Sequence, residues 1–110
     1  MKSLMRAGAA ALALTTTAIA PAGAVLYMYE HINYQGLMGT RSVQGSWNMA
    51  SQNNDELSSL ENITPWYASM WVNANQRGRC VAWAPGFRDP SFRSGDNDVM
   101  SSYRLSTQAC

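Results

Sequence analysis

Apolar and polar residues alternate over short stretches in most of the chain, and no helical periodicity is found after residue 24. Four such stretches predict β-strands arranged as two pairs, and a polar turn joins the strands of each pair. The predicted strands lie at 26–30, 37–43, 68–72 and 80–83. Residues 50–60 leave room for one short helical turn. Short strands at this spacing predict an all-β sandwich.

An internal repeat underlies this pattern. One frame, aromatic-x4-aromatic-x-Gly, occurs as YEHINYQG at 29–36 and recurs 42 residues later as WVNANQRG at 71–78, where Gln76 replaces the second aromatic. A different motif, NDELSS at 54–59, recurs 43 residues later as NDVMSS at 97–102. Because two unlike motifs recur in the same order at nearly one spacing, the chain consists of two copies of one unit.

The first motif predicts a β-hairpin with an aromatic brace. A glycine at the end of the turn tolerates a positive φ or a close backbone approach. Tyr29 lies seven residues before Gly36, on the incoming strand. We therefore expect its ring to fold over the turn and pack on the glycine. The alternative is an ordinary hairpin with tyrosines on its surface.

The second motif supplies only oxygen ligands. Two adjacent Asx residues offer side-chain oxygens and tolerate tight turns, a serine four positions after the first Asx offers a hydroxyl, and the backbone offers carbonyls. This set suits a hard cation such as calcium, which takes roughly six to eight oxygens. One motif has too few ligands, so two motifs related by a pseudo-twofold axis would share ligands and form two sites. The alternative is an Asx turn followed by a strand.

The N-terminal residues 1–24 predict a secretory signal peptide. A basic start precedes an apolar run at 7–20, and the segment ends in small residues at Ala24. The apolar run is shorter than the roughly 20 residues that span a bilayer. Cleavage after Ala20 is the alternative, although Pro21 would then follow the cut. The predicted mature domain covers 25–110, and the protein is expected to be secreted.

Charge and motif content exclude several classes of function. Eight basic residues become six when Lys2 and Arg6 leave with the signal peptide, against seven acidic residues. The mature chain therefore lacks the basic patch that drives nucleic-acid binding or membrane attack, and no long apolar run remains to span a membrane. One histidine and two cysteines are too few for a four-ligand zinc site. Without a metalloprotease, hydrolase or phosphate-loop motif, no enzymatic activity is expected.

Cys80 and Cys110 are the two cysteines of the chain. An even number in a secreted chain predicts a disulfide between them. It would close a loop of 31 residues and stabilise the fold by roughly 3–4 kcal/mol in the chain-entropy model. Two free thiols or an intermolecular bond are the alternatives.

Large side chains in both repeats are predicted to form the core. Trp66 and Tyr67, between the repeats, are expected to pack where the two copies meet, with an exposed binding patch as the alternative. His31, in the first hairpin, is expected to face solvent. The other predicted core residues are Trp47, Met49, Met70 and Trp83.

The alternating motifs resemble the signatures of the βγ-crystallin family, particularly its microbial calcium-binding branch, to which crystallin-like Streptomyces metalloproteinase inhibitors are related. The hairpin signature is complete in the first repeat and partial in the second, and the calcium signature N/D-N/D-x-x-S/T-S is complete in both. The resemblance implies a β-sandwich of two four-stranded Greek keys, the first at about 25–65 and the second at about 66–110. A monomer is expected.

The resemblance also implies the ligands of two calcium ions. Each ion would take the carbonyl of the residue after the first aromatic, the carbonyl at the third motif position and the hydroxyl at the fifth. An Asx side chain would cross from the other motif, and either Asx of each pair is a candidate. The implied ligands are the carbonyls of Glu30, Glu56, Val72 and Val99, the hydroxyls of Ser58 and Ser101, and side chains from Asn54, Asp55, Asn97 and Asp98.

The leading hypothesis is a secreted, non-enzymatic calcium-binding module whose ions lock the loops of the two Greek keys. The alternative on the same fold is a secreted peptidase inhibitor with a protease as its partner. An inhibitor needs a rigid exposed loop, and we expect that loop at 80–83, braced by the predicted disulfide at Cys80. The fold alone does not decide between these functions.

Overall fold

The computed structural model describes residues 22–110, so the predicted signal peptide at 1–24 lies almost entirely outside the described residues. Eight strands and one short 3₁₀ helix form in this part of the chain, and none of its helices is long and apolar enough to cross a membrane. The elements are β1 (Val25–His31), β2 (Gln35–Arg41), β3 (Gly45–Asn48), the 3₁₀ helix η1 (Ser51–Asn53), β4 (Ser59–Ile63), β5 (Tyr67–Asn73), β6 (Arg77–Trp83), β7 (Arg88–Asp89) and β8 (Ser102–Ser106).

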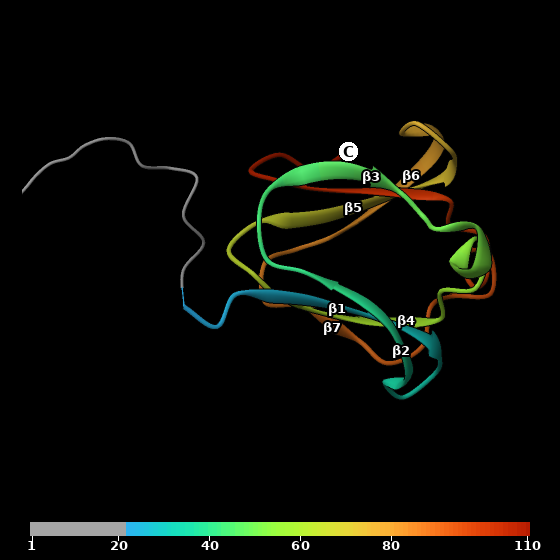
Figure 1. The fold of residues 1–110 in the computed structure, drawn as a ribbon, viewed down its shortest axis with the longest axis horizontal. Helices are drawn as coiled ribbons and strands as arrows, with labels where there is room; N and C mark the ends of the chain where they lie inside the picture. Colours follow the sequence, from blue (N-terminus) through green and yellow to red (C-terminus); the bar gives the residue numbers. More distant parts are fainter. Residues whose placement is uncertain (1–21) are drawn as a thin grey trace, which may run out of the picture.

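Two four-stranded antiparallel sheets pack face to face (Figure 1). The first has the strand order β2-β1-β4-β7, and the second has the order β3-β8-β5-β6. The third strand of each repeat crosses to the sheet of the other repeat, since β3 pairs with β8 and β7 pairs with β4. The predicted sandwich of two Greek keys is confirmed, and the exchange of strands joins the two repeats into one folded unit.

The sequence repeat is also a structural repeat. β1 and β2 recur as β5 and β6 with the 42-residue offset, and β4 recurs as β8 with the 43-residue offset. The predicted hairpins and the single helical turn, η1, are therefore confirmed for the described residues. The strand expected at 37–43 instead runs from Gln35 to Arg41. Sequence reasoning did not assign β3, β4, β7 and β8, which are short strands of two to five residues.

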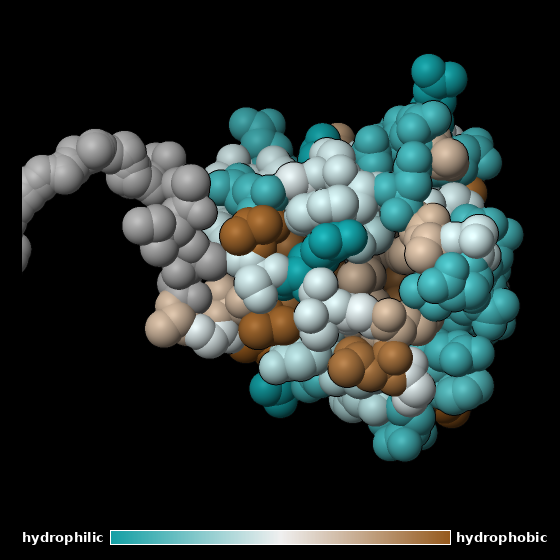
Figure 2. All heavy atoms as spheres, in the orientation of Figure 1, coloured by the Kyte–Doolittle hydropathy of each residue, from teal (hydrophilic) through white to brown (hydrophobic). Residues whose placement is uncertain are grey.

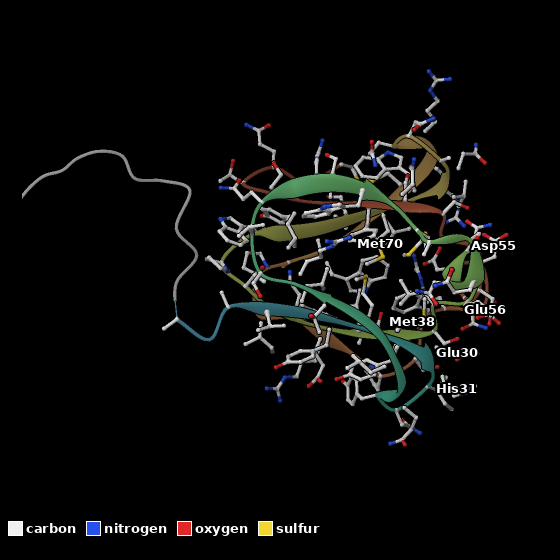
Figure 3. All side chains as sticks on the ribbon, viewed as in Figure 1. Glu30, His31, Met38, Asp55, Glu56 and Met70 are labelled. Atoms are coloured by element: carbon white, nitrogen blue, oxygen red, sulfur yellow. A yellow bond between two sulfur atoms is a disulfide. The ribbon has the colours of Figure 1, made fainter. Side chains whose placement is uncertain are left out.

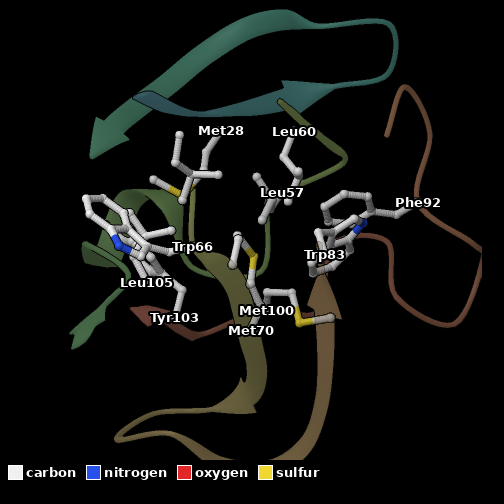
Figure 4. Close-up of a cluster of buried hydrophobic side chains, with 12 residues drawn as sticks. Met28, Leu57, Leu60, Trp66, Met70, Trp83, Phe92, Met100, Tyr103 and Leu105 are labelled. Carbon is white, nitrogen blue, oxygen red and sulfur yellow. The ribbon is translucent and has the colours of Figure 1, made fainter. Parts of the chain in front are cut away.

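The core lies between the two sheets (Figure 4). Strand alternation places Leu26 and Met28 of β1 inside, while Tyr27 and Tyr29 face outward. Trp66 is buried in the same core, as predicted. Met70 and Trp83 are also buried, and Trp47 and Met49 pack against the core while remaining partly exposed.

A C-terminal tail covers the outer face of the second sheet. Cys80 points to that face and forms the predicted disulfide with Cys110, whose Cα lies 5.9 Å from the Cys80 Cα. The Cys110 backbone N–H donates to the Ser69 hydroxyl of β5 at 2.9 Å. Ser69 is fully buried although it is on the outer face. The disulfide therefore holds the tail against the sheet.

Candidate metal centre

Both copies of the NDxxSS motif lie at the same end of the sandwich, just before β4 and β8. The side chains of Glu30, Asp55 and Glu56 gather at this end (Figure 3). His31 is there too, and its side chain is exposed, as predicted. The loops that carry the motifs are therefore close enough to interact.

Each motif sends an aspartate to the serine of the other motif. The Ser58 hydroxyl donates to Asp98 Oδ1 at 2.9 Å, and the Ser101 hydroxyl donates to Asp55 Oδ1 at 3.1 Å. The two contacts are equivalent under the pseudo-twofold relation of the repeats. Of each Asx pair, it is therefore the second member whose side chain crosses, a choice that the sequence had left open.

The backbone holds both aspartates in a conformation that favours Asx residues. Asp55 and Asp98 have φ values of 60° and 58°, in the left-handed region. The Asp55 N–H donates to the Met100 carbonyl at 3.1 Å, and the Asp98 N–H donates to the Leu57 carbonyl at 3.0 Å. The two loops thus fix one another through main-chain hydrogen bonds.

The serines at the fifth motif position are also anchored to the hairpins. The Ser58 N–H donates to the Tyr29 carbonyl at 2.9 Å, and the Ser101 N–H donates to the Trp71 carbonyl at the same distance. Ser58 therefore lies beside Glu30, and Ser101 lies beside Val72, the residues that follow the first aromatic of each hairpin. The structure thus assembles two groups: Glu30, Ser58 and Asp98 in one, and Val72, Ser101 and Asp55 in the other.

The remaining predicted ligands divide into two kinds. The carbonyls of Glu56 and Val99 accept none of the hydrogen bonds formed among residues 22–110, so their lone pairs are not used by other protein groups. Asn54 is exposed and takes no part in the serine–aspartate contacts. Asn97 is half-buried, and its Oδ1 is buried without a hydrogen-bond partner among the described residues.

The donor set is that of a hard-cation site. The described residues contain no cluster of three or more His, Cys, Asp or Glu side chains. Each candidate group instead combines one crossing carboxylate, one hydroxyl and backbone carbonyls. These oxygen donors fit calcium better than a transition metal.

The last serine of each motif has a structural role that sequence reasoning missed. The Ser59 hydroxyl donates to the His31 carbonyl at 2.6 Å and accepts the Tyr34 N–H at 3.2 Å. In the second repeat, Ser102 makes the matching contacts with the Asn73 carbonyl at 2.7 Å and the Gln76 N–H at 2.9 Å. The signal in the sequence is the final serine of the motif, which both copies share.

These serines hold two strained turns. Tyr34 and Gln76 have φ values of 60° and 56°, which bulky residues rarely adopt. Both serines are fully buried. The hairpin motif and the NDxxSS motif therefore occur together because the second motif closes the turn of the first.

The aromatic brace of the first hairpin differs from the expectation. The Tyr29 ring packs against Tyr34 in an edge arrangement, with ring centroids 5.7 Å apart. The side chains nearest to the position of a Cβ on Gly36 are His31 and Glu30. The Tyr29 hydroxyl donates to Glu61 at 2.7 Å. Burial, this hydrogen bond and the charge of Glu61 raise the pKa of Tyr29 to about 12.

The segment expected to form an inhibitory loop is a strand. Residues 80–83 belong to β6, at the edge of the second sheet. Val81 packs against the core and Trp83 is buried in it. The prediction of an exposed loop was wrong because the alternation of these residues places two of them in the interior.

Comparison with known proteins agrees with this architecture. Residues 25–83 match the model of peptidase inhibitor family I36. The chain belongs to this family. Among curated protein sequences, no match is found. Peptidase inhibitors and crystallins are non-catalytic kinds of protein, and a peptidase inhibitor has a protease as its partner.

Solved structures similar to this I36 family member are βγ-crystallin domains, which confirms the resemblance seen in the sequence. One from Clostridium beijerinckii is 26% identical with a TM-score of 0.61, covering 77% of this chain and 99% of that domain. One from an archaeon is 24% identical with a TM-score of 0.63, covering 74% and 96%. A structure that concerns the evolution of the eye lens βγ-crystallin fold is 20% identical with a TM-score of 0.68, covering 84% and 95%.

Proposed function

We propose that the protein is an extracellular, non-enzymatic domain that binds two calcium ions at the end of the sandwich where the NDxxSS loops meet. The reciprocal contacts Asp98–Ser58 and Asp55–Ser101 carry this proposal. Each contact joins groups from both repeats, so each ion would link the two Greek keys.

The ions would act on stability. A calcium ion takes oxygen ligands with flexible geometry, and the crossing carboxylate supplies the negative charge that such a site needs. In the unfolded chain the two motifs are far apart, so the ion binds chiefly the folded state. At 100 times the dissociation constant, one such site adds about 2.7 kcal/mol to the free energy of unfolding. Extracellular modules bind calcium at roughly 10⁻⁴–10⁻³ M, and we expect this range.

The test is calorimetric titration with calcium, together with melting temperatures in calcium and in chelator. Asp55→Asn and Asp98→Asn keep a residue that tolerates a positive φ but remove the crossing charge, so each should abolish one site and weaken the other. Ser58→Arg and Ser101→Arg should have the same effect. Glu56→Gln is the matched control, because it removes an acidic side chain from the same loop but keeps its main-chain carbonyl.

Magnesium should replace calcium poorly, since it requires a tighter octahedral site. If millimolar calcium leaves the melting temperature of the parent protein unchanged, the motifs are structural turns only and the proposal fails. If Glu56→Gln loses binding as strongly as Asp55→Asn, general loop charge rather than a specific ligand explains the effect.

Peptidase inhibition is a second candidate function, and membership of family I36 favours it. Proteases bind extended segments of their partners, and β6 is a seven-residue strand with an open edge. The disulfide at Cys80 ties this strand to the C-terminal tail. We therefore place the protease contact at the edge of β6 instead of a loop.

The inhibition test is a titration against a panel of secreted metalloproteases, including thermolysin-class enzymes. Stoichiometric inhibition supports this function, and a protein inert at micromolar concentration excludes it. Repeating the titration with Asp55→Asn shows whether inhibition requires the proposed calcium sites, so the two functions are tested separately.

A further inference from the structure

A cavity of about 220 Å³ opens on the side of the sandwich between β2 of the first sheet and β3 with η1 of the second. In the view of Figure 2, tan and pale residues surround a hollow in this face of the molecule. None of the predicted calcium ligands lines it. The lining residues used below are Met28, Met38, Arg41, Met49, Ala50 and Tyr103.

The cavity has an apolar floor. Met28 and Tyr103 are almost completely buried, and Met38 and Met49 are partly buried against the core. Methionine side chains are flexible and polarisable, so they adapt to apolar groups of different shape. The volume is below that of typical drug-sized ligand pockets, which limits an occupant to a small molecule.

Arg41 is the one charged residue among those lining the cavity. Its Nε donates to the Tyr103 hydroxyl at 2.8 Å, and its guanidinium carbon lies 4.5 Å from the centre of the Trp47 ring. No acidic group of the described residues forms an ion pair with it, and its terminal amino groups donate no hydrogen bond within residues 22–110. The guanidinium is therefore held in place, half-buried and without a counter-ion.

The equivalent side of the second repeat is different. Trp83 occupies the position of Arg41, and it stacks on Phe92 with ring centroids 4.7 Å apart. The cavity there, of about 340 Å³, is lined by the carboxylates of Asp89 and Asp96 as well as by Arg93. Of these two cavities, only the first combines a fixed cation with a lining that contains no acidic residue.

We propose that the cavity between β2 and β3 binds a small monocarboxylate with an apolar body, such as a short fatty acid or a single-ring aryl carboxylate. The carboxylate would accept hydrogen bonds from the terminal amino groups of Arg41, whose planar fork matches both carboxylate oxygens. The apolar body would lie on the methionine floor. This inference is independent of the proposed calcium sites.

The experiment is a titration of the ¹⁵N-labelled protein, followed by NMR, with hexanoate and phenylacetate as probes. Hexan-1-ol and phenylacetamide are the neutral counterparts. The carboxylates should bind at least about tenfold more tightly than the neutral probes, since a hydrogen bond to a charged group is worth this factor or more. The shifts should concentrate at Met38, Arg41 and Met49.

Variants distinguish the effect of the Arg41 charge on binding from the effect of a loss of folding. Arg41→Gln should remove the preference for carboxylates, and Arg41→Lys should keep only part of it, because lysine keeps the charge but lacks the planar fork. Arg77→Gln is the control that changes the net charge equally at an exposed site outside the cavity. Ala50→Phe should block the mouth and lower the affinity for all probes. Melting temperatures and near-ultraviolet circular dichroism show whether each variant is folded.

Three results would overturn the proposal: carboxylates that bind no better than neutral probes, an affinity that Arg41→Gln leaves unchanged, or shifts that map to another face. If Arg41→Gln does not fold, Ala50→Phe decides, because unchanged carboxylate binding in that variant excludes the cavity.

Discussion

The two repeats share a scaffold of hydrogen bonds but differ on their outer surfaces. In both, the final serine of NDxxSS closes the hairpin and an aspartate crosses to the other loop. On the outer face of the first sheet, Tyr27 and Tyr29 stack with centroids 6.4 Å apart. On the outer face of the second, the C-terminal tail lies over Ser69 and is bridged to Cys80.

This difference shows which positions the fold requires. The residues that satisfy backbone groups of the strained turns are the same in both copies, since Ser59 and Ser102 each bond a carbonyl and an N–H of their own hairpin. Residues on the sides and outer faces have diverged, as Arg41 and Trp83 show at equivalent positions. Arg41, the unpaired cation at the cavity, belongs to the first repeat, and both cysteines of the disulfide belong to the second.

The largest expected effect concerns the disulfide, which only the second repeat has. The double variant Cys80→Ala, Cys110→Ala should lose about 3–4 kcal/mol of unfolding free energy, because the unfolded chain is no longer cross-linked. Urea denaturation measures this loss, with Ser42→Ala as the control. Hydrogen exchange should become faster in β5 and β6 while β1 and β2 change little. Equal loosening of both hairpins would contradict the assignment of the tail to the second sheet.

The next largest loss of stability is expected when the serine that closes a hairpin is removed, and it should be equal in the two repeats. Ser59→Ala and Ser102→Ala each leave a hairpin N–H and a carbonyl without their buried partner, which should cost about 1–3 kcal/mol. Urea denaturation measures both variants, and Ser46→Ala, at an exposed position of β3, is the control. A loss in one variant only would show that the two turns are not held in the same way.

A smaller difference in stability is expected between alanine variants of the two hairpin glycines, Gly36 and Gly78. A Cβ on Gly78 would lie 2.6 Å from Asn73 Nδ2 and 2.9 Å from Val72 Cγ2, whereas the closest atom to one on Gly36 is His31 Cδ2 at 3.0 Å. Both glycines have positive φ values, so alanine costs about 1–2 kcal/mol at either position. Gly78→Ala should cost more because of the added clash.

Thermal denaturation of the two glycine variants measures this difference. Gly86→Ala is the control that isolates the backbone cost, since Gly86 has a φ of 77° and open space around it. If Gly36→Ala is the more destabilising variant, the second hairpin relaxes more easily than its contacts indicate.

The smallest effect is a pH dependence specific to the first repeat. The pKa of Tyr29 is raised to about 12 in the folded protein, against about 10 when unfolded. The folded state therefore holds the proton more strongly, and this contribution to stability is complete below pH 10 and is lost as the pH rises toward 12. Tyr29→Phe should flatten the decline in stability over this window, and Tyr67→Phe is the control. An unchanged decline in Tyr29→Phe would assign it to other groups.

Much of the architecture could be predicted from the sequence. Strand alternation and turn residues are local properties, so the hairpins around Gly36 and Gly78 and the single helical turn were expected correctly. The two-copy organisation followed from motif spacing, and the disulfide followed from having only Cys80 and Cys110 to pair. The resemblance of the same motifs to the βγ-crystallin family implied the ten candidate calcium ligands, and their binding of calcium stays a prediction.

Only the tertiary structure decided the features that depend on packing between distant segments. It placed β3 and β7 in the opposite sheets and made 80–83 an edge strand. It selected Asp55 and Asp98 as the residues that cross, and it showed that Ser59 and Ser102 close the turns. The motif alone does not identify the oxygen that contacts a residue about 40 positions away, because that contact depends on how the two sheets pack. The position of Arg41 beside an apolar cavity arises in the same way, because the hydroxyl that holds its guanidinium belongs to Tyr103, 62 positions further along the chain.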